Sequence, residues 1–156
     1  YAVSLVGRIL EAKRPAYVRI PKGEFNFPAS DEHLVKLPGE KNDILLVSYG
    51  APSQTCIKVQ QIDPSVSVLI VNRLRPLDKN VLAEALAPHS RIFVVEDHIP
   101  SCGLYGSLCE FVTENPCSGQ LYSLAPRNYL FTVGTSSNYF HQHYGIDFAG
   151  ILEAIK

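Results

Sequence analysis

The chain has 156 residues and a formal net charge of −1, and 46% of its residues are hydrophobic against 19% charged. This composition is typical of a globular protein and excludes an intrinsically disordered chain. No apolar run approaches the roughly 18 to 20 residues that span a bilayer, and there is no basic excess for nucleic acid. We therefore expect neither a membrane nor a nucleic acid as a partner, and one α/β domain with or without part of another.

The start of the chain is unusual because the sequence contains no Met and begins at Tyr1. A newly translated chain begins with Met, so we expect a fragment, a processed product or a sequence that is incomplete at its start. Residues 1–8 lack the basic and long apolar segments of a signal peptide. We expect a cytoplasmic protein, or a mitochondrial or plastid one if a targeting segment precedes Tyr1.

The first elements in chain order are a helix and a strand. Apolar residues at helical spacing predict an amphipathic helix over residues 2–12, which Pro15 ends. Residues 16–20 are predicted to form a strand. One helix and one strand bury too little apolar surface to fold alone, so this segment is typical of the end of a preceding α/β domain.

Residues 23–42 have the composition of a linker, with prolines, glycines and charged side chains. The middle of this segment, residues 32–37, is a candidate for a short strand.

From Asp43 onward, strands and helices alternate. Continuous apolar runs, typical of strands buried on both faces, occur at residues 44–48, 66–71 and 91–95. The helices are expected over residues 52–61, after an Asp78 cap, around residues 104–112 and after an Asp147 cap, and residues 120–124 could add an edge strand. Short connections between them predict a three-layer α/β/α domain with a mostly parallel sheet over residues 43–156.

The four cysteines are Cys56, Cys102, Cys109 and Cys117, and none of them forms a C-x-x-C pair. Reduced thiols are the favoured interpretation, and a disulfide within residues 102–117 is the alternative.

The most conspicuous polar cluster is Glu96, Asp97 and His98, directly after the third apolar run. Ligands bind at the carboxyl ends of parallel strands, and a His beside carboxylates can act as a general acid or base. A structural or interface loop is the favoured interpretation. Gly103 and Gly106 follow, where a helix N-terminus could attract an anion or the glycines could permit close packing or a subunit contact.

Four basic side chains stand near the ends of predicted strands. Arg19 and Lys22 make a possible phosphate-binding fork. Further along, Arg73 or Arg75 is expected to pair with nearby carboxylates in a loop where Pro76 and Asp78 start a helix.

Several motifs are weak or absent in this sequence. His141 and His143 lie two residues apart, which puts them on different faces of a helix, so a metal site is disfavoured and we predict none. The sequence also lacks a nucleophile elbow and a Gly-rich phosphate loop, and we predict no catalytic residue.

Five segments together resemble one known family: residues 15–23, 43–50, 71–78, 92–106 and 144–147. In this order they resemble the C-terminal region of transketolase-like thiamine diphosphate enzymes. That group contains transketolases, 1-deoxyxylulose-5-phosphate synthases and the beta subunits of 2-oxo-acid dehydrogenases. The resemblance implies that residues 1–22 end a pyrimidine-binding domain, residues 23–42 form a linker, and residues 43–156 form a five-stranded C-terminal domain with one antiparallel edge.

The resemblance also implies a function. The C-terminal domain of the family supports dimer assembly and binds no thiamine diphosphate, so the isolated chain should be inactive. The complete enzyme, a homodimer or a complex with a partner subunit, would use thiamine diphosphate and Mg²⁺ to transfer a two-carbon or acyl unit from a phosphorylated sugar or a 2-oxo acid. Arg19 matches an arginine that contacts the substrate phosphate, and Lys22 lies in the same motif.

One residue departs from the family pattern, because Leu104 replaces the second of two paired glycines. This departure puts close backbone packing, and with it the usual dimer contact, in question. A non-enzymatic, free-standing α/β module that docks a partner or binds a small anion is the alternative function. A flavodoxin-like nucleotide binder is disfavoured by the missing phosphate loop.

Overall fold

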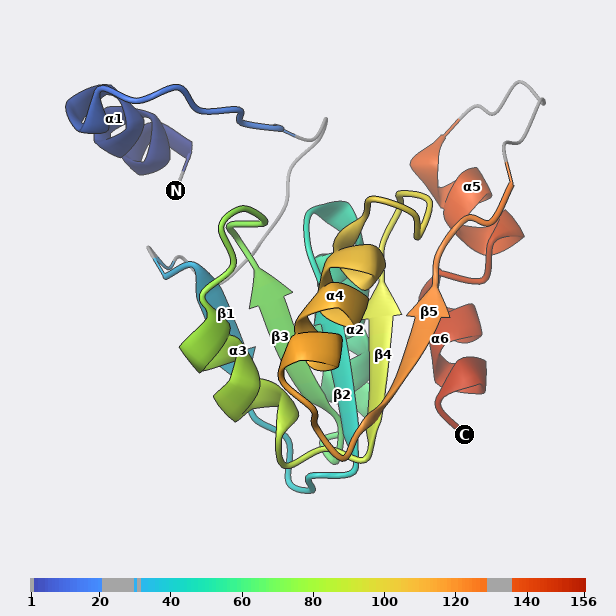
Figure 1. The fold of residues 1–156 in the computed structure, drawn as a ribbon. Coiled ribbons are helices and arrows are strands. Elements are labelled where there is room, and N and C mark those ends of the chain that lie inside the picture. The colour runs from blue at the N-terminus through green and yellow to red at the C-terminus, as the bar shows by residue number, and fades with distance from the viewer. Residues whose placement is uncertain (1, 21–29, 31, 129–135) are drawn as a thin grey trace.

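The computed structural model describes residues 2–20, 30, 32–128 and 136–156, and its centre is a five-stranded sheet (Figure 1). The strands are β1 (Leu34–Leu37), β2 (Ile44–Ser48), β3 (Ser67–Val71), β4 (Arg91–Val95) and β5 (Gln120–Leu124). Their order is β1-β3-β2-β4-β5; β1 pairs antiparallel to β3 and the other neighbours are parallel. The prediction of a mostly parallel five-stranded sheet is therefore confirmed.

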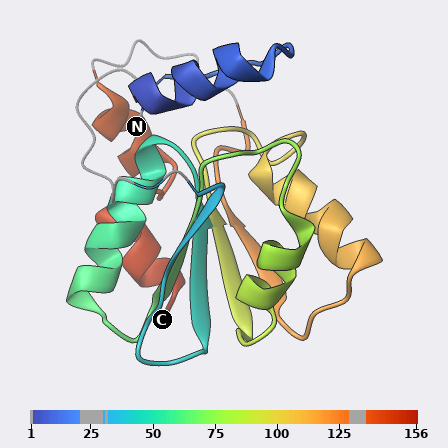
Figure 2. The same cartoon turned by 90° about the vertical axis from the view of Figure 1, so that its left-hand side faces the viewer.

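Helices cover both faces of this sheet, which gives the predicted three layers (Figure 2). On one face lie α2 (Ala51–Ile62) and α6 (Phe148–Ala154), and on the other lie α3 (Lys79–Leu86) and α4 (Leu104–Glu114). A further short helix, α5 (Ser137–His143), precedes α6 and was not predicted. Within the described residues, no helix combines the length and apolar character that crossing a membrane requires.

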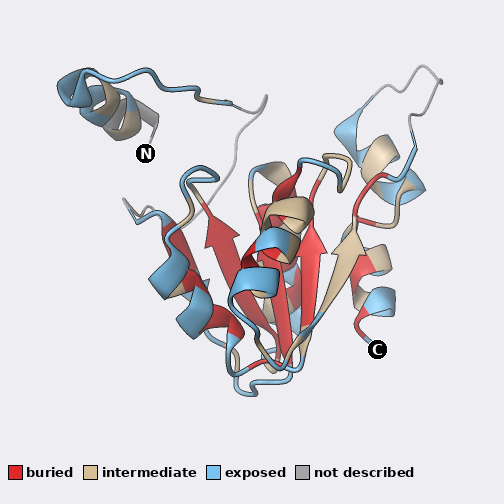
Figure 3. Ribbon diagram, in the orientation of Figure 1, coloured by how far each residue is buried: buried red, intermediate tan, exposed pale blue. Residues whose placement is uncertain are grey.

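The core consists of two apolar clusters, one on each face of the sheet (Figure 3). Every residue of β2 and β3 is buried, as the continuous apolar runs predict. Side chains alternate along a strand, so Leu45 and Val47 pack toward α3 and α4 while Leu46 packs toward α2. Each fully buried leucine contributes about 1.5 to 3 kcal/mol to the free energy of folding.

Two of the predicted helix caps are present. The Asp78 carboxylate accepts a hydrogen bond from the backbone N–H of Val81 at 3.2 Å, and the Asp147 carboxylate accepts one from Gly150 at 3.1 Å. Each cap satisfies an N–H group that has no partner within its helix, so α3 and α6 begin where the sequence indicates.

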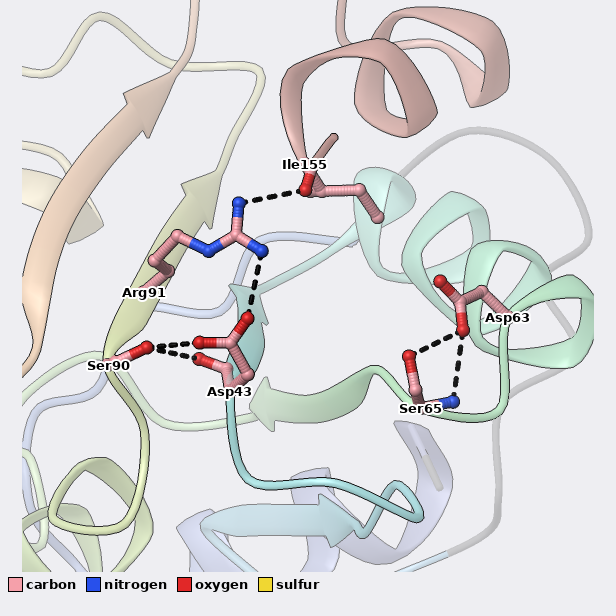
Figure 4. Close-up of polar contacts among 6 residues, drawn as sticks. All are labelled: Asp43, Asp63, Ser65, Ser90, Arg91 and Ile155. Carbon is pink, nitrogen blue, oxygen red and sulfur yellow. Dashed lines mark hydrogen bonds and ion pairs between the residues drawn. The ribbon is translucent and has the colours of Figure 1, made fainter.

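A polar cluster holds the amino-terminal end of the sheet together (Figure 4). The Arg91 guanidinium pairs with the Asp43 carboxylate at 2.9 Å and donates to the backbone carbonyl of Ile155 at 3.0 Å. The Ser90 hydroxyl also donates to Asp43. The end of α6 is thereby tied to the starts of β2 and β4.

The N-terminal segment corrects one prediction. The helix α1 (Ala2–Ala12) is present as predicted, but residues 16–20 form no strand, and Tyr17 and Ile20 are 89% and 67% exposed. A strand needs a neighbour for its backbone hydrogen bonds, and the described residues offer none here. The pyrimidine-binding remnant at residues 1–22 therefore stays a prediction.

The predicted linker, residues 23–42, contains β1, which belongs to the sheet. Its residues pair with β3 from Leu34 opposite Val71 to Leu37 opposite Val68. The short strand predicted within residues 32–37 is thus confirmed as β1. It forms the antiparallel edge that the family resemblance implies.

Candidate functional site

Glu96 is the most buried charged residue at the carboxyl-terminal edge of the sheet. It follows β4 directly, is 0% exposed, and its backbone N–H donates to the carbonyl of Leu124 at 3.1 Å. Its carboxylate accepts the backbone N–H groups of Leu104 at 2.8 Å and of Tyr105 at 3.0 Å. These are the first residues of α4, so Glu96 neutralises the positive end of that helix from the preceding strand.

The two predicted glycines explain how Glu96 and α4 come so close. A Cβ at Gly103 would overlap the Glu96 carboxylate and would lie 2.8 Å from the carbonyl oxygen of Ile99. A Cβ at Gly106 would lie 3.0 Å from the carbonyl oxygen of Pro100. Both glycines therefore permit close packing within this chain. The N-terminus of α4 holds the chain's own carboxylate, which leaves little room there for an external anion.

Tyr49, which follows β2, shares this edge with Glu96. Burial, followed by the negative charges of Glu96 and Asp97, raises the pKa of Tyr49 to about 12, while the charge of Arg19 acts in the opposite direction. Burial also raises the pKa of Glu96, against the effect of the two backbone donors. Tyr49 therefore carries a neutral hydroxyl at physiological pH.

Asp97 and His98 are partly exposed and line a pocket of about 410 Å³. The Nδ1 atom of His98 lies 2.7 Å from the carbonyl oxygen of Ile99, and because a carbonyl only accepts, Nδ1 carries the proton. His98 is thus oriented by the backbone of its own loop. The interpretation of His98 as a general acid or base beside the two carboxylates therefore stays a disfavoured prediction.

The predicted basic residues lie in different settings. Arg19 is exposed, and its effect on Tyr49 places it within electrostatic reach of this edge. Lys22 lies outside the described residues. Arg73 contacts the ring nitrogen of His33 at 3.2 Å, and Arg75 donates to the Ser107 hydroxyl at 3.3 Å. The prediction that one of these last two arginines pairs with a carboxylate is wrong for the described residues, among which neither forms an ion pair.

The comparison with known protein families decides what this domain is. The family model described as Transketolase, C-terminal domain, matches residues 34–151. The chain belongs to the transketolase C-terminal domain family. The matched range contains all five strands and most of the helices, together with the Glu96 site.

Curated relatives of this transketolase C-terminal domain are longer proteins. The chain is 26% identical over 153 residues to a 1-deoxy-D-xylulose-5-phosphate synthase of Chlamydia trachomatis, with 83% of this chain and 24% of the relative covered. It is 24% identical over 166 residues to an apulose-4-phosphate transketolase subunit of Phocaeicola vulgatus, with 97% of this chain and 52% of the relative covered. The chain therefore spans about a quarter of the synthase and about half of the transketolase subunit.

Among solved structures, a split-gene transketolase described as an inactive beta4 tetramer superposes with a TM-score of 0.65. The alignment covers 78% of this chain and 41% of that one at 18% identity. At this level of identity, the likeness shows the fold.

A metal ion in this transketolase C-terminal domain would require a group of His, Cys, Asp or Glu side chains. In the part of the chain that the structure describes, no three His, Cys, Asp or Glu side chains come together to hold a metal ion. His141 and His143 lie in the last turn of α5. All four cysteines are free thiols, and burial raises the pKa of Cys56 to about 12.

A second pocket was not predicted from the sequence. It measures about 360 Å³, lies at the end of β5, and is lined by Ser123, Arg127, Asn128, His143 and Tyr144, among others. The available signal was the run of polar residues directly after the edge strand. The pocket, however, also requires the end of α5 to lie near the end of β5, and no local sequence pattern indicates such a tertiary arrangement.

Proposed function

We propose that this chain is the C-terminal assembly portion of a thiamine diphosphate-dependent transketolase-like enzyme and is inactive in isolation. The single observation that carries the proposal is that apolar side chains of the N-terminal segment are exposed. Leu10, Tyr17 and Ile20 are 71%, 89% and 67% exposed there, although apolar side chains gain free energy from burial. A further domain or subunit that covers them would account for this exposure.

The length of the relatives supports the same proposal. Because this chain spans about a quarter of the synthase and half of the transketolase subunit, the reaction chemistry would come from domains outside it. Both relatives are named for sugar phosphates, which favours a phosphorylated sugar over a 2-oxo acid as the substrate of the complete enzyme. Thiamine diphosphate and Mg²⁺ would be bound there, between the diphosphate-binding and pyrimidine-binding domains.

Within such an enzyme, we assign the contact with the substrate phosphate to Arg19, with Lys22 beside it. Arg19 is exposed and lies on the same segment as Tyr17 and Ile20. A domain or subunit that covers these two side chains would therefore also lie close to Arg19. Replacing Arg19 with alanine in the assembled enzyme should raise KM for the phosphorylated substrate and leave kcat largely unchanged. An unchanged KM would remove Arg19 from the site.

Assembly can be tested by mixing the chain with the complementary portion that carries the thiamine diphosphate-binding domains. Size-exclusion chromatography with light scattering should show a stable complex, and activity should appear only in the mixture. Tyr17→Glu together with Ile20→Asp should weaken assembly because the exposed apolar side chains are lost. Ile62→Asp is the matched control, since Ile62 is 69% exposed on the domain itself.

Two results would contradict the proposal. The first is micromolar binding of thiamine diphosphate by the chain alone in calorimetry. The second is a failure of the unmodified chain to form a complex with the complementary portion, which would favour a free-standing docking module. Normal assembly of the Tyr17 and Ile20 double variant would remove these two side chains from the contact.

A further inference from the structure

The pocket at the end of β5 has an uneven charge. Its described lining includes the guanidinium of Arg127 and the imidazole of His143, and no Asp or Glu side chain is among these described residues. In the described structure, Arg127 forms no ion pair with a carboxylate. An unpaired guanidinium presents its donors in a fork that matches the oxygens of a phosphate.

Arg127 is exposed at this β5-end pocket, so its guanidinium is open to a ligand. The exposed residues Asn128 and His143 belong to the same lining.

The β5-end pocket adjoins the pocket of about 410 Å³ that His98 lines, because Asn128 and Tyr144 line both. The Tyr144 hydroxyl donates to the backbone carbonyl of Asn128 at 2.8 Å and fixes this shared wall. Phe140 and Ile146 give the larger pocket an apolar and aromatic lining. A polar, cationic pocket therefore lies next to one that suits a flat ring.

We propose that these two pockets together bind a small molecule that carries a phosphate group on a ring. The phosphate lies in the β5-end pocket against Arg127, with Asn128 and His143 in the same lining. The ring lies in the neighbouring pocket against Phe140. The site is separate from Arg19 and needs no thiamine diphosphate, so it goes beyond the function proposed above.

The test uses the full chain and two probes, inorganic phosphate and phenyl phosphate, with binding followed by amide chemical shifts in NMR. Phenyl phosphate should bind saturably and about tenfold more tightly than phosphate, since burying part of a ring adds favourable apolar contact. Arg127→Gln should weaken both probes by about tenfold or more, and Arg127→Lys should weaken them less. Phe140→Ala should weaken phenyl phosphate and leave inorganic phosphate unchanged.

Arg73→Gln is the matched control, because Arg73 is an exposed arginine after a different strand of the same sheet. It should leave both affinities as they are. An absence of saturable binding, or equal affinities in the wild type and Arg127→Gln, would overturn the proposal. Equal affinities of the two probes, or no effect of Phe140→Ala, would overturn its ring-binding part.

Discussion

Removing the carboxylate of Glu96 should be among the most destabilising polar substitutions in this domain. In Glu96→Ala, the backbone N–H groups of Leu104 and Tyr105 lose the acceptor that lies 2.8 and 3.0 Å away. Each buried donor left without a partner costs about 1 to 3 kcal/mol, so for the two donors we expect a loss of about 2 to 6 kcal/mol in the free energy of unfolding. A domain of this size is stable by only about 5 to 15 kcal/mol.

Urea denaturation followed by circular dichroism measures this loss. With a slope of about 2 kcal/mol per molar urea, the midpoint of unfolding should fall by about 1 to 3 M. Glu96→Gln should lose less, because its amide oxygen still accepts one of the two N–H groups. Asp97→Asn is the control, since Asp97 takes no part in the cap, and it should change stability by no more than about 0.5 kcal/mol.

The pH dependence provides a second measurement of the same site. Because burial raises the pKa of Glu96 above its ordinary value of 4.5, the folded protein holds the proton more tightly than the unfolded chain. The contribution to stability is full below pH 4.5 and is lost as the pH rises through the folded pKa. Glu96→Gln should lack this loss. A Glu96→Ala variant that unfolds within about 0.5 M urea of the wild type would refute the reasoning.

Three further predictions concern other parts of the fold. Burial lowers the pKa of His89 below its ordinary value of 6.5, so its contribution to stability is full above pH 6.5 and is lost as the pH falls from there through the folded pKa; His89→Gln should not show this decrease in urea midpoints. Arg91→Ala removes an ion pair and the hydrogen bond to Ile155, which should cost about 1 to 2 kcal/mol and speed amide exchange in α6. Gly103→Ala places a methyl group against the Glu96 carboxylate and should lower stability by about 1 to 3 kcal/mol in urea.

Each of these three changes has a matched control. His143→Gln replaces an exposed histidine and should keep the decrease in stability below pH 6.5. Lys156→Ala removes an exposed pair with Glu153 and should cost about 0.5 kcal/mol or less. Gly7→Ala adds a Cβ that meets nothing within 4 Å and should be neutral or slightly stabilising. A control that changes as much as its test variant would contradict the corresponding explanation.

Three of the correctly predicted strands share one property. β2 and β3 are buried throughout and β4 is buried apart from Arg91, so their apolar character is continuous and local. The Asp78 and Asp147 caps were also predictable, because a cap is a contact over three residues. The failed strand at residues 16–20 shows the limit, since a strand depends on a neighbour that no local pattern supplies.

The candidate site was less predictable for the same reason. Glu96 was a candidate by its position after a strand, but its burial depends on the loop that brings Leu104 back onto it. α5 escaped detection because residues 137–143 have no apolar periodicity; the described side chains of this helix are exposed or partly exposed. The pocket at the end of β5 depends on this helix, so it could be found only from the structure.

The two hydrogen bonds that Glu96 accepts also constrain the residues between Glu96 and α4. They hold the residue that follows β4 against the first turn of α4, so both ends of the loop formed by residues 97–103 are fixed in place. The first residues of this loop, from Asp97 to Ile99, line the larger pocket. Substitutions at these residues should therefore change the lining of the pocket while the strand and the helix keep their positions.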